Sequence, residues 1–213
     1  LELYSEEIPP KLQISARKEL KLLLVKALEE ECLKYKSIST YSSPTRLTIL
    51  ITEIPEKVKI LSKEIRGPKV GVLDDILNSF VRANSASKKD IFKKEIEKGS
   101  FYFIKTKPKE VLSKDLLIKI VLNSIASLSW RKSMRWSDKN LLWGRPLMSI
   151  LAIFNRKILS FNYGHLKSKD TTVVEQDLSI KYKKVKSYSE YQTFLKNNKI
   201  ILDHDEREKK ILK

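Results

Sequence analysis

Cysteine, histidine and glycine are scarce in this sequence of 213 residues, which holds one cysteine, two histidines and five glycines. The single cysteine, Cys32, cannot form an internal disulfide, and we expect it to be a small buried hydrophobe in a reducing compartment. So few glycines provide no glycine-rich phosphate loop, and the sequence shows no paired Cys-x-x-Cys and no other metal-ligand spacing. The common motifs of nucleotide-binding and metal-dependent enzymes are therefore missing.

Long apolar runs are also missing. The longest candidates, residues 116–125 and 147–154, fall short of the roughly 18 residues that a membrane helix needs. Leu1–Tyr4 is an apolar, strand-like segment without a preceding basic stretch, so it does not predict a signal peptide. We expect a cytoplasmic protein with no membrane partner. Because the first residue is not methionine, we also expect the chain to begin inside a longer reading frame.

The residues that could support catalysis do not converge in the sequence. His165 follows a predicted strand, and His204 lies between two aspartates at a predicted helix start; we expect both to be exposed polar residues. Asp74 and Asp75 are neighbours on a predicted helix, where adjacent side chains point about 100° apart. Their expected role is at the helix N-terminus, where the dipole favours anions. The residues alone favour binding over catalysis, with no catalytic residue and no metal.

Positive charge is what the sequence has in excess: 43 lysines and arginines stand against 26 aspartates and glutamates, giving a net charge of +17. Residues 1–36 hold seven of each sign, so the excess lies downstream. Residues 130–170, which we call the basic centre, hold nine basic and two acidic side chains. Such a surplus attracts polyanions, nucleic acid above all. The alternative is that part of the surplus reflects codon bias in a genome poor in G and C, since only nine of the 43 basic residues are arginine.

All three tryptophans, Trp130, Trp136 and Trp143, lie in the basic centre among arginines and lysines. Indole and guanidinium planes stack on RNA bases, and arginine forks bind phosphate at two points. In the alternative, the tryptophans are core residues and the arginines extend past them to solvent. We favour the core for Trp130 and Trp136 and leave both readings open for the arginines.

Helices and strands alternate along the chain. Apolar periodicity, capping residues and turn residues predict helices at 12–35, 72–84, 113–128 with Ser113 as cap, 187–197 and 203–213, and strands at 1–4, 45–52, 57–65, 91–96, 101–106, 147–154, 157–163, 180–185 and 200–202. This order predicts an α+β fold of interleaved helices and mostly antiparallel strands. We expect an N-terminal α+β lobe over 1–108, a second α+β lobe with the basic centre over 109–202, and the start of a truncated helix over 203–213. One compact domain is the alternative.

Short motifs occur along the chain in the order in which one family has them. Glu6-Glu7-Ile8-Pro9-Pro10-Lys11 is similar to an opening Glu-Glu-Leu-Pro-Pro-Lys, and Ser43-Pro44-Thr45-Arg46-Leu47 to Thr-Pro-Arg-Arg-Leu. Further matches are Arg66-Gly67-Pro68, Ser79–Arg82, Gly99–Tyr102, Lys132–Trp136, Arg145-Pro146 and Ile200–Arg207. Together they resemble the N-terminal portion of the bacterial glycyl-tRNA synthetase beta subunit.

The resemblance implies a subunit of an aminoacyl-tRNA synthetase, a ligase that charges tRNA with glycine at the expense of ATP. It implies that the ATP-using catalytic site lies on a separate alpha subunit, in a tetramer of two alpha and two beta chains, and that this part of the beta subunit holds no cofactor. The implied partners are the alpha subunit and the tRNA for glycine. The implied fold is similar to the editing-type domain of the phenylalanyl-tRNA synthetase beta subunit, by analogy only.

Two stretches depart from that family. Where the family reads Arg-Pro-Ile-His-Trp, this chain has Arg145-Pro146-Leu147-Met148-Ser149. After Thr171-Thr172 the family continues with a Gly-His-Arg-Phe stretch, whereas this chain has Val173–Asp177. We do not carry over any function of the replaced residues.

From the resemblance and the charge we expect this part to support tRNA binding. The candidate phosphate contacts are Arg46, Arg66, Lys69, Arg131, Lys132, Arg135 and Arg145. The alternative is a structural scaffold without direct RNA contact, for which the neutral amphipathic helix at 12–35 would be the interface with another subunit or with later parts of the same chain. Editing of mischarged tRNA ranks last, because no constellation supplies a nucleophile or an activated water.

Overall fold

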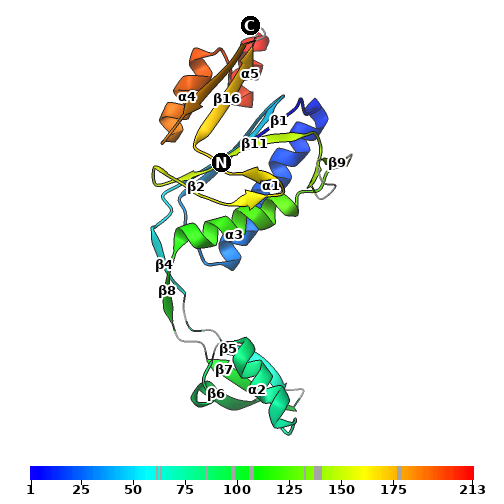
Figure 1. The fold of residues 1–213 in the computed structure, drawn as a ribbon, viewed down its shortest axis with the longest axis vertical. Coiled ribbons are helices and arrows are strands. Elements are labelled where there is room, and N and C mark those ends of the chain that lie inside the picture. The colour runs from blue at the N-terminus through cyan, green and yellow to red at the C-terminus, as the bar shows by residue number, and fades with distance from the viewer. Residues whose placement is uncertain are drawn as a thin grey trace. The chain divides into compact units, whose positions relative to one another are not determined.

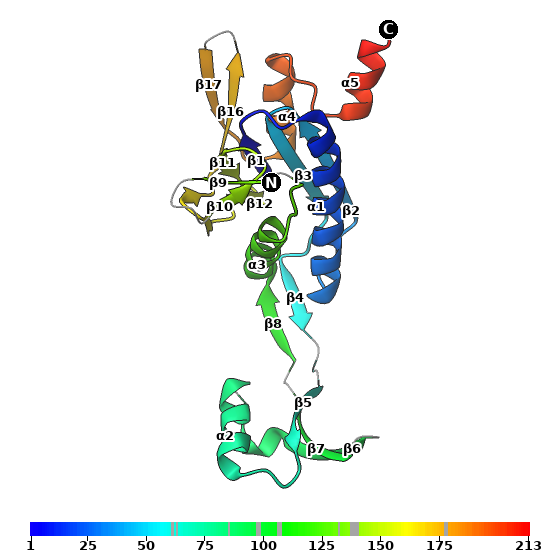
Figure 2. The same cartoon turned by 90° about the vertical axis from the view of Figure 1, so that its right-hand side faces the viewer.

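The computed structural model describes residues 1–60, 62, 64–84, 86–96, 99–105, 108–131, 133–136, 141–176 and 179–213. Their contacts form two compact units, drawn from two directions in Figures 1 and 2. Unit 1 comprises residues 1–56 and 112–213, and unit 2 comprises residues 57–111. Both units contain helices and antiparallel strands, which confirms the predicted α+β class.

Unit 1 is built on a four-stranded antiparallel sheet in the order β11-β1-β3-β2. The strands are β1 (Glu2–Ser5), β2 (Ser37–Ser43), β3 (Arg46–Thr52) and β11 (Leu147–Leu151), and the helices are α1 (Pro10–Glu30), α3 (Ser113–Ala126), α4 (Tyr188–Asn197) and α5 (His204–Ile211). The remaining strands form two-stranded ribbons: β9 (Met134–Trp136) with β10 (Leu141–Trp143), β12 (Ile153–Phe154) with β13 (Lys157–Ile158), β14 (Asn162–Tyr163) with β15 (Leu166–Lys167), and β16 (Thr171–Gln176) with β17 (Ser179–Lys184).

One face of the central sheet is apolar and packs on α1. Leu3 of β1 lies opposite Leu47 of β3, and both are 1% exposed. Helix α1 contacts β2, β3 and α3, and its side chain Leu24 lines a small cavity together with Ile49 and Ile51. Because alternate residues of a strand point to opposite sides, Leu47, Ile49 and Ile51 share this face.

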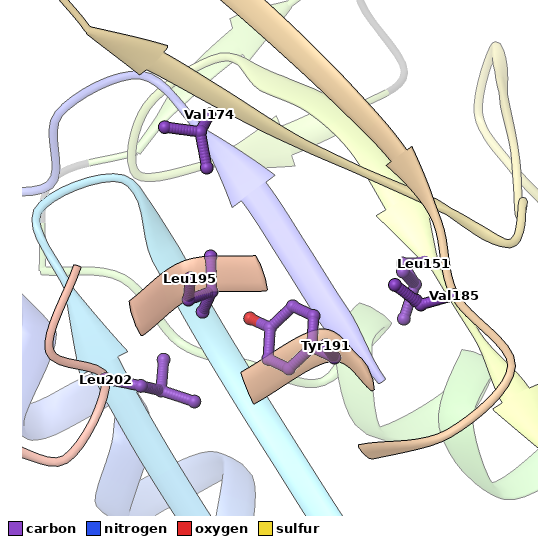
Figure 3. Packing of buried hydrophobic residues seen from close by; sticks show 6 residues of the cluster. All are labelled: Leu151, Val174, Val185, Tyr191, Leu195 and Leu202. Carbon is purple, nitrogen blue, oxygen red and sulfur yellow. The ribbon is translucent and has the colours of Figure 1, made fainter. Parts of the chain in front are cut away.

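The other face of the sheet carries polar residues and packs on α4. Figure 3 shows the buried cluster on this side, with Tyr191 and Leu195 of α4 near β1. The cluster also includes Leu151, Val174, Val185 and Leu202. All four residues of β1 are buried, as expected for a strand covered on both faces.

Unit 2 is a three-stranded antiparallel sheet with one helix. The sheet has the order β5-β7-β6, and the elements are β5 (Glu64–Lys69), α2 (Asp74–Ala83), the short 3-10 helix Lys88–Asp90, β6 (Ile91–Ile96) and β7 (Gly99–Lys105). A two-stranded ribbon of β4 (Lys57–Ile60) and β8 (Lys109–Leu112) carries the chain into and out of this unit.

The units do not coincide with the lobes expected at 1–108 and 109–202. Strand β1 pairs with β3 on one side and with β11 on the other, so one sheet contains strands of both expected lobes. What separates is an insertion, residues 57–111, between two parts of unit 1. Periodicity identifies a strand but not its partner, because the partner is selected by packing of residues far apart in the sequence. The expected final helix is present as α5 and belongs to unit 1.

Four local predictions are wrong. Residues 147–154 and 157–163 do not form two long strands; only β12 and β13 pair with each other, while β11 pairs with β1 and β14 with β15. Residues 57–65 are not one strand, since β4 pairs with β8 and β5 pairs with β7 in a separate sheet. Residues 200–202 form no strand; the chain there leaves α4 through Lys199, whose φ is 59°. Ser113 does not cap α3, because it is the first helical residue and Leu112 occupies the cap position. The cap of α4 is confirmed, since the Ser187 hydroxyl accepts a hydrogen bond from the Glu190 amide.

Strand β2 and the position of Cys32 were missed for different reasons. The sequence of β2, Ser-Ile-Ser-Thr-Tyr-Ser-Ser, has too few apolar residues to show strand alternation, yet it pairs with β3 along its whole length. Cys32 is exposed, which corrects the expected burial. Because α1 ends at Glu30, Cys32 lies in the following turn with a φ of 54° and not on the apolar stripe.

Candidate nucleic-acid interface

The basic centre is organised around two packed tryptophans. Trp130 and Trp143 lie with ring centroids 4.9 Å apart, and they are 9% and 1% exposed. Trp143 is the last residue of β10, which pairs with β9. The prediction that Trp130 is a core residue is confirmed, whereas the side chain of Trp136 lies outside the described residues. Neither Trp130 nor Trp143 is free to stack on an RNA base.

Gly144 allows the two tryptophans to meet. A Cβ atom at this position would lie 2.3 Å from Cε3 of Trp130. We expect Gly144→Ala to push the indole aside and to lower the free energy of unfolding by about 1–3 kcal/mol, the usual cost of overpacking. Denaturant unfolding followed by tryptophan fluorescence measures this effect. In a Trp130→Phe background, where the smaller ring leaves room, the same change should cost less; an equal cost in both backgrounds would contradict the steric explanation.

The arginines around the tryptophan pair reach solvent. Arg131 follows Trp130, Arg135 lies in β9, and both are exposed, while Arg145 is half-buried. Within the described parts of the chain, none of the three forms an ion pair with a carboxylate. Of the seven candidate phosphate contacts, these three belong to the basic centre in sequence and reach solvent; Lys132 lies outside the described residues.

A hollow of about 390 Å³ opens beside Trp130. Its walls include Ser133, Leu142 and Tyr163. Burial raises the pKa of the Tyr163 hydroxyl, so this group stays protonated and can donate a hydrogen bond at neutral pH. The hollow therefore adds a polar donor and an apolar wall beside Trp130.

Arg46 is a core residue and is removed from the set of phosphate contacts. Its side chain is 3% exposed, and its Nε donates a hydrogen bond to Oε2 of Glu2 at 3.0 Å. The Glu2 carboxylate, itself 1% exposed, also accepts from Thr172 Oγ1 at 2.8 Å and from Tyr191 OH at 2.6 Å. A second guanidinium nitrogen of Arg46 donates to the carbonyl of Val173. The network joins strands β1, β3 and β16 with helix α4.

The same network changes the pKa of Tyr191, the tyrosine whose hydroxyl donates to Glu2. Burial, followed by the negative charge of Glu2 and the hydrogen bond to it, raises the pKa of Tyr191 well above its usual value. Tyr191 therefore remains a neutral donor, and the Glu2 carboxylate is fully occupied by its donors. A carboxylate held in this way is not available as a general base.

Arg66 and Lys69 belong to unit 2, whereas the basic centre belongs to unit 1. Both are exposed residues of β5. The Cζ atom of Arg66 lies 3.8 Å from the centroid of the Phe101 ring on β7, a cation–π contact. Both cations were predicted as phosphate contacts but the phenylalanine was not, although the three consecutive aromatic residues at 101–103 were a signal for it.

The histidines and the aspartate pair form no catalytic group among the residues that the structure describes. His165 is exposed in the turn between β14 and β15, as expected. His204 is one-third exposed, and its Nε2 lies 3.2 Å from Oδ1 of Asp205. The Asp203 carboxylate caps α5 by accepting hydrogen bonds from the amides of Asp205 and Glu206. This cap accounts for the position of Asp203 close to His204 and Asp205. Asp74 and Asp75 lie in the first turn of α2, as predicted.

The described fold and site define a cation-rich α+β protein in which arginines of the basic centre reach solvent. A family model described as the glycyl-tRNA synthetase beta subunit matches residues 1–213. Over 208 residues, 98% of this chain, the sequence is 33% identical to the glycine–tRNA ligase beta subunit of Rickettsia canadensis and 34% identical to that of Rickettsia bellii. The chain belongs to the glycyl-tRNA synthetase beta subunit family.

This chain spans 31% of the Rickettsia canadensis relative and 32% of the Rickettsia bellii relative. The similarity to them therefore concerns about a third of a longer protein. Among the described helices, none combines the length and the apolar composition that a membrane crossing requires.

Proposed function

We propose that this chain is the N-terminal part of the beta subunit of a heterotetrameric glycine–tRNA ligase and that it supports tRNA binding while glycyl-tRNA forms. In this proposal the catalytic site and its ATP belong to the alpha subunit, two alpha and two beta chains assemble, and the reaction takes place in the cytoplasm. This part of the beta subunit then needs no cofactor of its own. The family membership and the charge of the chain support the proposal.

The observation that carries the RNA role is the exposure of the arginines in the basic centre. Arg131 and Arg135 are exposed and Arg145 is half-buried, and none of them has a carboxylate partner among the described residues, while Trp130 and Trp143 are buried. The packed pair Trp130 and Trp143 supports this part of the chain, and Arg135 is presented on β9. Exposed guanidinium groups bind phosphate oxygens and release counterions from the nucleic acid.

A filter-binding titration of the chain with transcribed tRNA for glycine tests this proposal. We expect binding that weakens steeply with salt, with a slope of about −0.9 per phosphate contact on a double-logarithmic plot for a duplex stem. Arg131→Gln combined with Arg135→Gln should weaken binding and make the slope shallower by about two contacts.

The matched control removes two charges elsewhere in the same unit. Lys209→Gln with Lys210→Gln alters exposed residues near the end of α5 and keeps the net charge equal to that of the arginine pair variant. We expect it to bind as the unchanged chain does. Undetectable or salt-insensitive binding of the unchanged chain would end the RNA role for this part of the protein.

The scaffold alternative expected the apolar stripe of the first helix to be the interface with another subunit or with later parts of the chain. The apolar stripe of α1, with Ala16, Leu20, Leu24 and Leu28, is buried within this chain and cannot at the same time face another subunit. The editing-type resemblance to the phenylalanyl-tRNA synthetase beta subunit stays a prediction of fold alone.

A further inference from the structure

We propose that one face of the three-stranded sheet in unit 2 binds unpaired nucleotides of an RNA by stacking and by phosphate contact. This inference deepens the proposed function and rests on it, because it assigns a second contact surface to the same RNA. The surface is separate in sequence from the basic centre and includes three phenylalanines and the four cations described below.

The strand register defines this face. On β7, Phe101, Phe103 and Lys105 alternate with Tyr102 and Ile104, so the first three share one side of the sheet. Residues directly opposite on the neighbouring strands point to the same side. On this basis the aromatic face, as we call it, consists of Phe92 and Lys94 on β6, Phe101, Phe103 and Lys105 on β7, and Glu64, Arg66 and Lys69 on β5.

Helix α2 packs on the opposite face. Ile104, on that side, is fully buried, and Ile65 and Ile91 lie directly across from it. Gly67 approaches the ring of Phe80 in α2 so closely that a Cβ atom would lie 2.4 Å from it. Helix α2 therefore leaves the aromatic face uncovered. The four cations of this face are exposed: Arg66, Lys69, Lys94 and Lys105.

Two partly exposed rings, Phe92 and Phe101, offer stacking surface on this face, and the buried ring of Phe103 supports them. Phe103 is 8% exposed and stacks with Phe92 at a centroid distance of 5.9 Å. Phe92 and Phe101 stay partly exposed on either side of it. The Cζ atom of Arg66 lies 3.8 Å from the centroid of Phe101, and the Arg66 side chain is exposed, so a base can reach the guanidinium from solvent. Aromatic rings and guanidinium planes are the surfaces on which single-stranded bases stack.

A hollow of about 560 Å³ adjoins the aromatic face at Phe92 and Lys105. Lys89 and Asp90 also line it, and the Asp90 carboxylate accepts a hydrogen bond from the Ser87 amide. Its size lies within the range of small-ligand sites. A base stacked near Phe92 would thus have two lysine ammonium groups within the same recess.

The charge of unit 2 selects a polyanion as the occupant. Residues 57–111 hold fourteen basic and seven acidic side chains. On the aromatic face the only carboxylate, Glu64, is paired with Lys94 at 2.7 Å, so Arg66, Lys69 and Lys105 remain without an acidic partner there among the described residues. An acidic peptide would satisfy the cations but not the stacking surfaces, whereas RNA satisfies both.

The test compares variants of the chain in binding a short single-stranded RNA, an octauridylate that carries one 4-thiouridine for crosslinking. Arg66→Lys keeps the charge but loses the planar stacking surface, and Phe101→Leu removes the ring beneath it. We expect each to weaken binding about tenfold, the effect of one lost base stack. Lys69→Gln should weaken binding and make the salt slope shallower by about one contact.

Lys93→Gln is the matched control, because Lys93 lies on β6 next to Lys94 but points to the opposite face, across from Tyr102. It should bind as the unchanged chain does, and the crosslinks should map to residues 91–105. Circular dichroism checks that Phe101→Leu is folded, and the exposed Arg66→Lys substitution gives the result independently of that check.

The failures of the two proposals are distinguishable. If the chain binds tRNA through Arg131 and Arg135 but the aromatic-face variants bind the octauridylate normally, or crosslinks map only to 130–145, this inference is overturned and the proposed function stands. If the chain binds neither RNA at low salt, both are overturned. If polyglutamate competes and only Lys69→Gln weakens binding, the face belongs to an acidic protein partner and the RNA assignment is overturned.

Discussion

Replacing Arg46 by alanine is expected to lower the free energy of unfolding of unit 1 by about 3–5 kcal/mol. The Glu2 carboxylate is 1% exposed and would remain buried without its counter-charge. Such a loss is a large fraction of the 5–15 kcal/mol that stabilises an ordinary domain. Guanidinium unfolding followed by tryptophan fluorescence reports on this unit, because all three tryptophans belong to it.

A double-mutant cycle isolates the ion pair from the loss of side-chain volume. The double variant Glu2→Gln with Arg46→Met should lose less free energy of unfolding than the sum of the losses of the two single variants. Each single variant leaves one buried charge without its partner, whereas the double variant leaves none. Tyr191 keeps a partner in Thr48 at 3.0 Å, which limits the damage to the rest of the network. Strict additivity of the two single effects would show that the pair is not coupled.

Replacing Leu24 by aspartate is expected to unfold unit 1 or to destabilise it by at least about 4 kcal/mol. Leu24 is 1% exposed on the stripe of α1 that packs on the sheet, and the change combines a lost apolar contact with a buried unpaired carboxylate. Leu22, two residues earlier on the same helix, is 69% exposed. Leu22→Asp should change stability by no more than about 0.5 kcal/mol, as is usual for surface positions.

The two variants Leu24→Asp and Leu22→Asp also test how this chain associates with another subunit. If Leu24→Asp abolishes co-purification with an alpha subunit while Leu22→Asp does not, the loss follows from unfolding and not from a lost contact, and circular dichroism of the variant will show it. A folded Leu24→Asp variant would contradict the burial of the stripe in the core. The helix was predicted correctly from its periodicity, but the periodicity did not reveal whether the stripe faces this chain or a partner.

The candidate site was predictable in part. The composition identified the basic centre, because a charge surplus is visible without any structure, and the core role of Trp130 was predicted correctly, whereas that of Trp143 was not. The role of Arg46 was not predictable, since its partner Glu2 lies 44 residues away and the donors Thr172 and Tyr191 lie farther still. The aromatic face of unit 2 was also missed, because it is assembled from three strands whose register is fixed only on pairing.

By itself the sequence determined the class of fold, the positions of the main helices and the polyanion-attracting charge, since local periodicity and composition depend only on neighbouring residues. The capping residues of α4 and α5 and the turn at Asn155-Arg156 belong to the same local group. Only the tertiary structure decided which strands pair, that residues 57–111 form a unit of their own, and which arginines meet solvent and which meet a buried carboxylate. The reason is physical: burial and pairing depend on contacts between residues distant in the chain, and no local pattern specifies those contacts.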